Sequence, residues 1–427
     1  MLGEGLRDYE HNIGAFRIIS PAISVLYIVF MYIFGLYNSS RQKLPEVLYT
    51  VSLISLMLML SVMAICFFVR GGAMAFPRSV ILLSTGLWLI ILSIWRFVVW
   101  KIAKMKHGKQ EVMLVGNDTE QLLNCLNKKY QDIYRVKFIQ EQVDDLIKEN
   151  MKLCDVVFIT SNIKEVEREK VFSFASELNL PIYFIPKYSD ISIMNASFQQ
   201  TDDIPTYQIS KIELSLEERF VKRTFDIILS SIGFVISLPL FIICAILVKL
   251  DRGPVFYSQE RLTVNKKMFK MLKFRTMIPD AEKKSGPVLA GDKDPRITSV
   301  GRFMRAARLD EIPQILNILK GNMSIVGPRP ERPFFVEQFE AEIPEYALRM
   351  KTKAGLTGMA QVWGKYNTTA AEKLRYDLIY LNQYSFLQDI LIILQTIKIL
   401  FLKNSTEGVS SSKAVKEKSD FFSEHKA

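Results

Sequence analysis

The sequence has few of the residues on which many enzyme mechanisms depend. Histidine occurs only three times in 427 residues, at His11, His107 and His425, and none of these lies near the charged motifs described below. The four cysteines are isolated, without the paired spacing that indicates a metal site or a disulfide framework. We therefore expect neither a histidine base nor a Ser-His-Asp triad, and acid-base or nucleophilic chemistry falls to carboxylates.

Motifs for nucleic-acid and dinucleotide binding are also missing. No zinc finger or aromatic ribonucleoprotein strand accompanies the net charge of +11, so we assign the excess of basic residues to anionic lipid and phosphate and expect no nucleic-acid partner. A dinucleotide fingerprint requires three glycines, and only Gly116 follows the first predicted strand of the α/β region. A structural or regulatory role is favoured for that region.

Long apolar runs, in contrast, are abundant in a chain that is 49% hydrophobic. Residues 13–37, 47–69 and 79–100 are each long enough to cross a bilayer, for which roughly twenty residues suffice. We predict three transmembrane helices within residues 1–105. A cluster of lysines follows the third run and, by the positive-inside rule, places the downstream chain in the cytoplasm. These lysines are Lys101, Lys104, Lys106 and Lys109.

Short strands and helices alternate between residues 106 and 205, which predicts a Rossmann-like domain with a parallel α/β sheet. The expected strands are residues 111–115, 136–139, 155–160 and 181–186, with helices over 118–130, 143–150 and 164–178. Residues 206–403 are expected to form a mixed, mostly helical domain. Residues 404–427 are rich in serine, lysine and glutamate, and we expect a disordered tail.

A fourth apolar run, within residues 222–250, has Pro239 at its centre. A proline there removes one backbone hydrogen bond and clashes with the preceding turn, so the helix must bend. Cations bracket the run at both ends, and a helix that enters the membrane, bends and returns keeps both clusters at the cytoplasmic face. We interpret the run as a re-entrant membrane helix. The alternative is a proline-kinked helix that spans the bilayer.

Two adjacent carboxylates, Asp310 and Glu311, are the candidate catalytic residues. They directly precede a helix predicted to begin at Pro313 and to stop at Gly321. The N-H groups and the dipole at that end of a helix stabilise anions, whether carboxylate or phosphate. The sequence therefore predicts that a phosphate could be held here beside a nucleophile.

Basic residues surround this pair in the sequence. Arg302, Arg305 and Arg308 recur every three residues, so at helical spacing they would form one cationic stripe that leads to the carboxylates. Lys273 and Arg275 lie two apart in KKMFKMLKFR, and an extended segment would direct both toward a diphosphate. An equally compatible interpretation is an interfacial segment whose lysines meet lipid phosphates.

Arg329 lies between two prolines in SIVGPRP. Fixed φ angles on both sides leave little backbone freedom, so the guanidinium is presented in a nearly rigid loop. Such an arginine suits a phosphate or a nucleotide edge. The alternative is an arginine that only caps a carbonyl in that loop.

With these motifs the chain resembles the bacterial sugar transferase family, the monotopic phosphoglycosyl transferases, which move a sugar 1-phosphate from a nucleotide sugar to a polyprenyl phosphate. The resemblance covers about residues 222–403 and includes KRTFD, GPVFYSQER, KFRTM, LDEIPQ, VGPRPE and AGLTG. It implies that Asp310 attacks the sugar-linked phosphate and that Glu311 helps to hold Mg²⁺ beside it. It also implies that Arg305 and Lys273 lie near the phosphates.

The resemblance implies further partners and a location. The helices and α/β domain in front are similar to the long form of the family, which acts in exopolysaccharide, capsule or O-antigen initiation. The implied substrates are a UDP-sugar and undecaprenyl phosphate, with membrane lipid as surroundings, at the cytoplasmic face of the bacterial inner membrane. The sequence does not name the sugar and leaves self-association into a homo-oligomer open. A different class of function is a non-catalytic scaffold or sensor of a polysaccharide assembly complex, with the dyad merely capping a helix.

Four features depart from the family pattern, the first of which is RLTVNKK in place of a more glycine-rich turn. Long members carry four amino-terminal membrane helices, whereas we predict three. Ala354 replaces a proline that usually precedes glycine, and Lys365 stands where arginine is usual.

Overall fold

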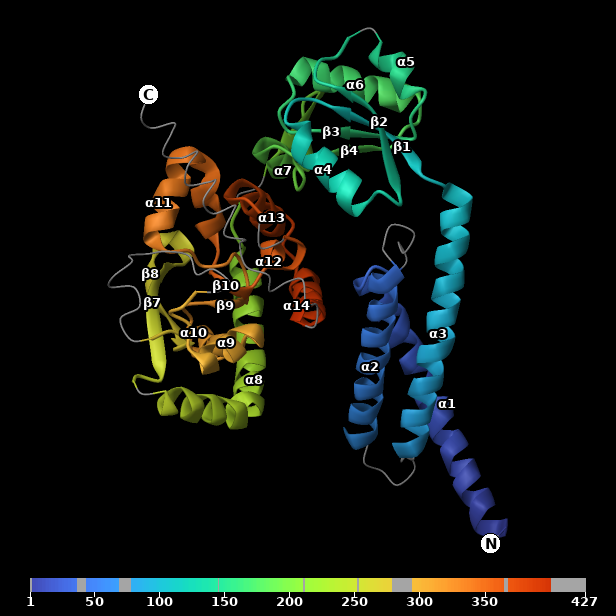
Figure 1. Ribbon diagram of the computed structural model, residues 1–427, viewed down its shortest axis with the longest axis vertical. Helices are drawn as coiled ribbons and strands as arrows, with labels where there is room; N and C mark the ends of the chain where they lie inside the picture. The colour runs from blue at the N-terminus through green and yellow to red at the C-terminus, as the bar shows by residue number, and fades with distance from the viewer. Residues whose placement is uncertain are drawn as a thin grey trace. The chain divides into compact units, whose positions relative to one another are not determined.

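The computed structural model describes residues 2–36, 44–68, 78–144, 146–209, 212–251, 253–278, 294–364 and 368–400. The chain divides into two compact units, Met1–Pro186 and Lys187–Ala427, and each is described by itself (Figure 1). The predicted tail, from residue 404 onward, lies outside the described residues.

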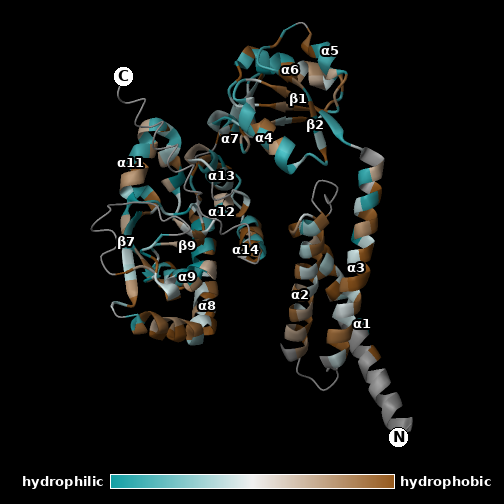
Figure 2. Ribbon diagram, viewed as in Figure 1, coloured by the Kyte–Doolittle hydropathy of each residue, from teal (hydrophilic) through white to brown (hydrophobic). Residues whose placement is uncertain are grey.

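Three apolar helices open the first unit, as predicted. They are α1 (Leu2–Ile33), α2 (Leu44–Phe68) and α3 (Arg78–His107). Helices α2 and α3 contain stretches long and apolar enough to cross a membrane, Leu44–Cys66 and Ser79–Ile102, and α1 contributes the shorter apolar stretch Ser20–Ile33. Hydrophobic residues dominate α2 and α3 over most of their lengths (Figure 2). Apolar helices of this length are typical of membrane-spanning segments, so these stretches support a membrane location.

Arg96 joins two of these helices. Its side chain is 8% exposed within α3 and donates a hydrogen bond of 3.1 Å to the carbonyl oxygen of Leu36, just after α1 ends. The guanidinium thus satisfies a carbonyl of the turn that follows α1. This hydrogen bond therefore joins the turn after α1 to the middle of α3.

A four-stranded parallel sheet follows, in the order β2-β1-β3-β4. Its strands are β1 (Gln110–Val115), β2 (Tyr134–Gln140), β3 (Val156–Ile159) and β4 (Ile182–Phe184), joined through α4 (Thr119–Lys129), α5 (Ile147–Met151) and α6 (Glu165–Glu177). Successive residues of β1 face opposite sides: Leu114 packs near Leu126 of α4, whereas Val115 packs near Val171 of α6. Burial on both faces explains the continuous apolar run. The predicted parallel α/β sheet is confirmed.

The second unit begins before the predicted boundary at residue 205. Helix α7 (Tyr188–Ile193) places Ile191 in the core of this unit, and the Asn382 side chain donates a hydrogen bond to the Ile191 carbonyl. An antiparallel hairpin of β5 (Ser197–Thr201) and β6 (Ile204–Gln208) follows and does not join the parallel sheet. The two compact units thus divide after Pro186, because the chain beyond β4 buries its apolar residues elsewhere.

Helix α8 (Leu216–Leu250) contains 35 residues with Pro239 inside it. It starts with a capping box, in which the Ser215 hydroxyl accepts from the Glu218 N-H and the Glu218 carboxylate accepts from the Ser215 N-H. Figure 1 shows two arms that meet at a sharp bend, and Figure 2 shows that the second arm is largely hydrophobic whereas the first begins hydrophilic. The bend agrees with the proline-broken helix predicted for this run.

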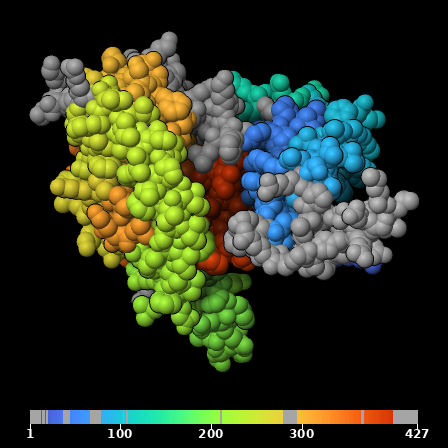
Figure 3. Space-filling view, turned by 90° about the horizontal axis from the view of Figure 1, so that it is seen from below, coloured from blue at the N-terminus to red at the C-terminus, as the bar shows by residue number. Residues whose placement is uncertain are grey.

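Both arms of α8 pack against the rest of the second unit. A straight helix would separate Lys222 from Val248 by about 39 Å, yet each is buried against the same unit. The outward surface stays apolar, and Figure 3 shows the atoms of α8 as a ridge on the face seen from below. Its exposed residues include Ile228, Ile232, Val235, Ile236, Ile243 and Ile246. Such a ridge is suited to lipid and not to water.

The rest of the second unit is mixed and mostly helical, as predicted. Strand β7 (Phe256–Leu262) pairs antiparallel with β8 (Met268–Phe274), and β9 (Ser324–Val326) pairs parallel with β10 (Gly355–Thr357). The helices are α9 (Ser299–Ala306), α10 (Gln314–Leu319), α11 (Pro333–Glu342), α12 (Met359–Trp363), α13 (Ala370–Asn382) and α14 (Phe386–Leu400). Tyr346, Leu374 and Tyr380 are among the fully buried residues of its main core.

Candidate active site

The Asp310 and Glu311 pair occupies a short 3-10 turn, η3 (Leu309–Glu311), between α9 and α10. Helix α10 begins at Gln314, with Pro313 as its N-cap, and ends before Gly321, whose φ is +87°. The prediction of a helix between the proline and the glycine is therefore confirmed. Positive φ at Gly321 favours glycine, which explains the stop.

The second arm of α8 supports this turn. Leu309 and Ile312, on either side of the dyad, pack against a cluster that contains Cys244 and Val248 of α8. The Asp310 carboxyl is only 8% exposed at this position. The dyad is thus attached directly to the apolar helix and is not carried on a distant loop.

Glu311 is bound by two cations through the same oxygen. Lys273 Nζ and Arg329 Nη2 each lie 2.8 Å from Glu311 Oε1. Burial raises the pKa of Glu311, but the charges of Arg329 and Lys273 and their hydrogen bonds outweigh burial, and the pKa lies well below its usual range. Glu311 is therefore ionised at any physiological pH.

Asp310 has the opposite tendency. Burial raises its pKa above the ordinary 3.8; the Lys273 charge opposes this, the Glu311 charge adds to it, and Arg305 and Arg329 oppose it more weakly. Two neighbouring carboxylates are thus given opposed pKa shifts, an arrangement found where two acids have different roles. Four of the predicted site residues, Lys273, Arg305, Glu311 and Arg329, lie close enough to act on Asp310.

Arg305 is held in place by Thr276, which the sequence analysis did not single out. Arg305 Nε donates a 2.8 Å hydrogen bond to Thr276 Oγ1, and Thr276 is 7% exposed. Helix α9 approaches this residue closely, since a Cβ at Gly301 would lie 2.1 Å from the Thr276 carbonyl oxygen. Thr276 belongs to the KFRTM motif, so its place in that motif was the available signal.

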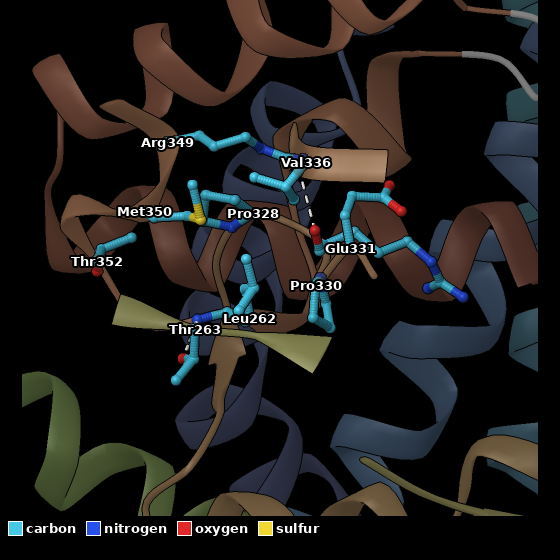
Figure 4. A pocket seen from close by; sticks show the side chains of 11 residues that line it. Leu262, Thr263, Pro328, Pro330, Glu331, Val336, Arg349, Met350 and Thr352 are labelled. Carbon is cyan, nitrogen blue, oxygen red and sulfur yellow. Dashed lines mark hydrogen bonds between the residues drawn. The ribbon is translucent and has the colours of Figure 1, made fainter. Parts of the chain in front are cut away.

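Arg329 lies on a loop that is fixed from behind by Arg349. Arg349 Nη2 donates a 3.1 Å hydrogen bond to the Arg329 carbonyl oxygen, across a small cavity lined by Pro328 and Pro330 (Figure 4). Arg349 is itself paired with Asp377 at 2.8 Å. The Arg329 side chain remains 40% exposed, so the site is open to solvent on this side.

Arg275 is not brought to the dyad. It is 6% exposed, and its Nη2 donates to the carbonyl oxygens of Val248 and Asp251, each at 3.2 Å. Arg275 thus caps the carboxyl end of α8. Gly253, with φ +136°, makes room for it, because a Cβ there would lie 1.7 Å from Arg275 Nη1. Lys273 and Arg275 therefore do not act as one diphosphate-binding pair here.

The expected stripe of three arginines is wrong. Helix α9 ends at Ala306, and Arg308 has a left-handed conformation, with φ +54°, beyond the helix. Arg302 is exposed on α9, whereas the charge of Arg305 lowers the pKa of Asp310. The helical spacing failed because the chain reverses at Arg308 to present η3.

The dyad fits a metal ion that is shared with a phosphate ligand. Within the described ranges, no cluster of three or more acidic, histidine or cysteine side chains could hold a metal by itself. Mg²⁺ is commonly held by one or two carboxylates together with substrate phosphates and water. Glu311 and Asp310 supply such carboxylates.

Comparisons with known proteins identify the family of the chain. Residues 217–403 match the family model described as bacterial sugar transferase. The chain is 34% identical over 238 residues, 55% of this chain and 55% of the other, to the UDP-N-acetylgalactosamine-undecaprenyl-phosphate N-acetylgalactosaminephosphotransferase of Aeromonas hydrophila. It is 32% identical over 284 residues, 65% of this chain and 61% of the other, to the UDP-glucose:undecaprenyl-phosphate glucose-1-phosphate transferase of Klebsiella pneumoniae.

A shorter relative is matched over most of its length. The exopolysaccharide production protein ExoY of Rhizobium meliloti is 34% identical over 200 residues, which is 43% of this chain and 87% of that protein. The aligned region spans between half and two thirds of the Aeromonas and Klebsiella proteins. The shared region contains the dyad, its cations and α8, and the chain belongs to the bacterial sugar transferase family.

Proposed function

We propose that the chain transfers a sugar 1-phosphate from a UDP-sugar to undecaprenyl phosphate at the cytoplasmic face of the bacterial inner membrane. This reaction would initiate exopolysaccharide, capsule or O-antigen synthesis. The observation that carries the proposal is Asp310, a carboxylate close to Lys273 and Arg329 on a turn that packs against an apolar helix. The names of the relatives support undecaprenyl phosphate and a sugar nucleotide as the two substrate classes.

In the first step Asp310 is the nucleophile. One carboxylate oxygen attacks the phosphorus bonded to the sugar, a new O-P bond forms, and the phosphoanhydride bond to UMP breaks. The product is an aspartyl phospho-sugar, and UMP leaves with the bridging oxygen. Arg329 is partly exposed beside the dyad and can bind phosphate oxygens, since phosphoryl transfer depends mainly on positioning and charge stabilisation.

In the second step the lipid phosphate attacks the same phosphorus. A polyprenyl phosphate oxygen forms the new bond, the bond to Asp310 breaks, and the carboxylate is regenerated. This step requires the dyad to lie at the depth of the lipid headgroups. A re-entrant α8 would achieve that, because its second arm contacts Leu309 and Ile312 and its outer surface is apolar.

Magnesium is part of the proposal, with Glu311 and Asp310 as its protein ligands. When bound, Mg²⁺ would neutralise charge on the diphosphate. Lys273 and Arg329 hold Glu311 ionised and in a fixed position, as a metal ligand requires. Both cations thus have a supporting role even before a substrate arrives.

The test uses the purified full chain in lipid nanodiscs with undecaprenyl phosphate, Mg²⁺ and a panel of UDP-hexoses, and it measures UMP release and covalent capture of labelled sugar phosphate. Asp310→Asn should abolish both signals. Glu337→Gln, an exposed acid on α11, is the matched control and should retain them. Normal turnover by Asp310→Asn would refute the nucleophile, and the panel would identify the sugar.

The second candidate is a membrane scaffold or sensor without catalysis. It is favoured only by the presence of a separate parallel α/β domain, which the transfer reaction does not use. A scaffold would release no UMP with any UDP-hexose in the assay above. It would instead have to be recovered with other proteins of polysaccharide assembly.

A further inference from the structure

The α/β domain of the first unit contains a cavity of about 310 Å³ that the transfer reaction does not use. Its lining side chains are mostly polar: Asn117, Glu141, Gln142, Asn162, Lys164 and Glu167. All of them follow the carboxyl ends of strands β1, β2 and β3 or lie in the first turn of α6.

The cavity lies at the point where the strand order reverses. The chain passes from β1 to β2 on one side and then crosses to β3 on the other side of β1, which gives the order β2-β1-β3. In open α/β sheets, ligands bind at such a switch point, in the crevice beyond the carboxyl ends of the strands. The topology therefore places this cavity where ligands bind in such sheets, and its volume is within the range of ligand pockets.

The loop after β1 is already fixed in shape. Gly116 has φ +109°, and a Cβ on it would lie 2.4 Å from Thr160 Oγ1 of the neighbouring segment. Asn162 Nδ2 donates a 3.0 Å hydrogen bond to Asp118 Oδ2, and the Asn117 N-H donates to the Asn162 carbonyl oxygen at 3.4 Å. The segments that follow β1 and β3, which form two edges of the cavity, are thus joined by hydrogen bonds.

Charge in the cavity argues against phosphate. Glu141 and Glu167 line it, Asp118 adjoins it, and among the lining residues that the structure describes Lys164 is the one cation. The first turn of α4 also carries an acid, Glu120. A diphosphate would meet several carboxylates at the helix ends where phosphate is usually bound, and the single glycine at position 116 does not provide the dinucleotide turn.

The same groups suit hydroxyl donors. Carboxylate and amide oxygens accept hydrogen bonds from hydroxyls, and Glu141 directly follows β2, the strand beside β1. In doubly wound domains an acid about 20 residues beyond the glycine turn binds the ribose hydroxyls, and Glu141 has the corresponding place after Gly116. The volume, at the lower end for ligand pockets, suits one or two rings and not a dinucleotide.

We propose that this cavity binds a neutral sugar ring through adjacent hydroxyls, with Glu141 as the main acceptor and Gln142 and Asn162 as further partners. Two sources share this chemistry, the ribose of a nucleoside and a free hexose. Either would make the α/β domain a sensor for a neutral metabolite of sugar-nucleotide chemistry, separate from the Asp310 site.

Saturation-transfer difference NMR on the full chain in nanodiscs tests the proposal, with uridine, adenosine, glucose and galactose as separate probes. Ring protons of at least one probe should receive saturation. Glu141→Ala should lower the affinity of the protein for that probe by about tenfold, which is the loss expected when a hydrogen bond to a charged group is removed. The matched control is Glu149→Ala, an exposed acid on α5 outside the cavity, and both variants should keep the wild-type unfolding midpoint.

The probes also distinguish the sources. Binding of nucleosides but not hexoses identifies ribose, and the reverse identifies a hexose. The proposal is overturned if no probe binds. It is also overturned if binding is unchanged in both Glu141→Ala and Gln142→Ala, which is the result expected for uridine bound at the Asp310 site. Tighter binding of NAD⁺ than of adenosine to the cavity would overturn it as well.

Discussion

The side chain of Arg349 donates a hydrogen bond of 3.1 Å to the main-chain carbonyl oxygen of Arg329. Arg349 is in turn paired with Asp377 at 2.8 Å, and both side chains are almost fully buried. The loop that presents Arg329 to Glu311 is therefore fixed by an ion pair in the interior of the second unit.

Replacement of Asp377 by alanine should destabilise the protein strongly, because it leaves the Arg349 charge buried without its partner. Loss of one member of a buried pair costs about 3 to 5 kcal/mol. Denaturant unfolding followed by tryptophan fluorescence measures the change. Glu213→Ala, which removes an exposed partner of Lys351, should cost at most about 1 kcal/mol. Equal effects of the two substitutions would contradict this role for Asp377.

The raised pKa of Asp310 predicts the acid limb of the pH-rate profile. Attack requires the ionised carboxylate, so kcat/KM for UMP release should fall as pH decreases through a pKa above the ordinary 3.8. The Lys273 charge lowers that pKa, and Lys273→Met should therefore shift the acid limb to higher pH. Lys270→Met, an exposed residue of the same strand, should not. A limb that moves to lower pH in Lys273→Met would contradict the assignment.

Asp310 should also reduce stability at neutral pH. Burial raises its folded pKa, so stability associated with its proton is present at low pH and is lost as pH rises through the folded pKa. Asp310→Asn should therefore raise the unfolding midpoint at neutral pH while it abolishes turnover, a trade-off common at active sites.

Asp294→Asn is the control with the opposite sign. Its hydrogen bonds with Arg296 lower the pKa of Asp294, so this carboxylate stabilises the protein above its unfolded pKa and the amide should lower the midpoint at neutral pH. If both amides shift the midpoint in the same direction, the pKa argument for Asp310 fails.

Local sequence signals predicted the elements that they specify directly. The alternation of apolar strands and helices gave the parallel sheet, because strands such as β1 are buried on both faces and read as continuous apolar runs. Pro313 and Gly321 predicted the bounds of α10 correctly, because residues at helix ends act on the helix within one turn.

Contacts between distant residues were not predictable in this way. Arg349 and Asp377 look like ordinary surface charges in the sequence, and only the packing of α13 buries them together. The regular spacing of the three arginines predicted one helical face, but Arg308 has a left-handed backbone conformation and lies beyond the end of α9. Arg275 was predicted to bind phosphate but caps the carboxyl end of α8, because Gly253 leaves room for its guanidinium there. The error at Arg275 comes from tertiary structure overriding a local pattern.

A second buried network ties the first arm of α8 to the carboxyl-terminal helices. Lys222 Nζ donates hydrogen bonds to Asp389 Oδ2 at 2.6 Å and to the Tyr380 hydroxyl at 3.0 Å. Lys222→Met should leave the Asp389 charge buried without a cation, with the Tyr380 hydroxyl as a remaining hydrogen-bond donor, and the cost should be about 3 to 5 kcal/mol. The double variant Lys222→Met/Asp389→Leu should recover most of that loss, since both charges are then gone. Additive losses in a double-mutant cycle would exclude a coupled pair.

The last prediction concerns the bend in α8. Pro239→Ala restores a backbone hydrogen bond and removes the clash with the preceding turn, so the helix should straighten. Its second arm would then leave Leu309 and Ile312, and UMP release should fall by about tenfold to a hundredfold, as expected when catalytic groups are misplaced. Ile236→Ala, an exposed residue of the same helix, is the control and should retain turnover.

Topology provides the second measurement of that bend. Single cysteines at Glu217 and Lys249, both exposed, are introduced after the four native cysteines have been replaced, and a membrane-impermeant maleimide is added to oriented vesicles. In the wild-type background both positions should react from the same side, because a re-entrant helix returns both ends to one face. In Pro239→Ala the cysteine at position 249 should become protected from that side. Reaction from opposite sides in the wild-type background would make α8 a kinked spanning helix, and the headgroup depth of Asp310 would then need another explanation.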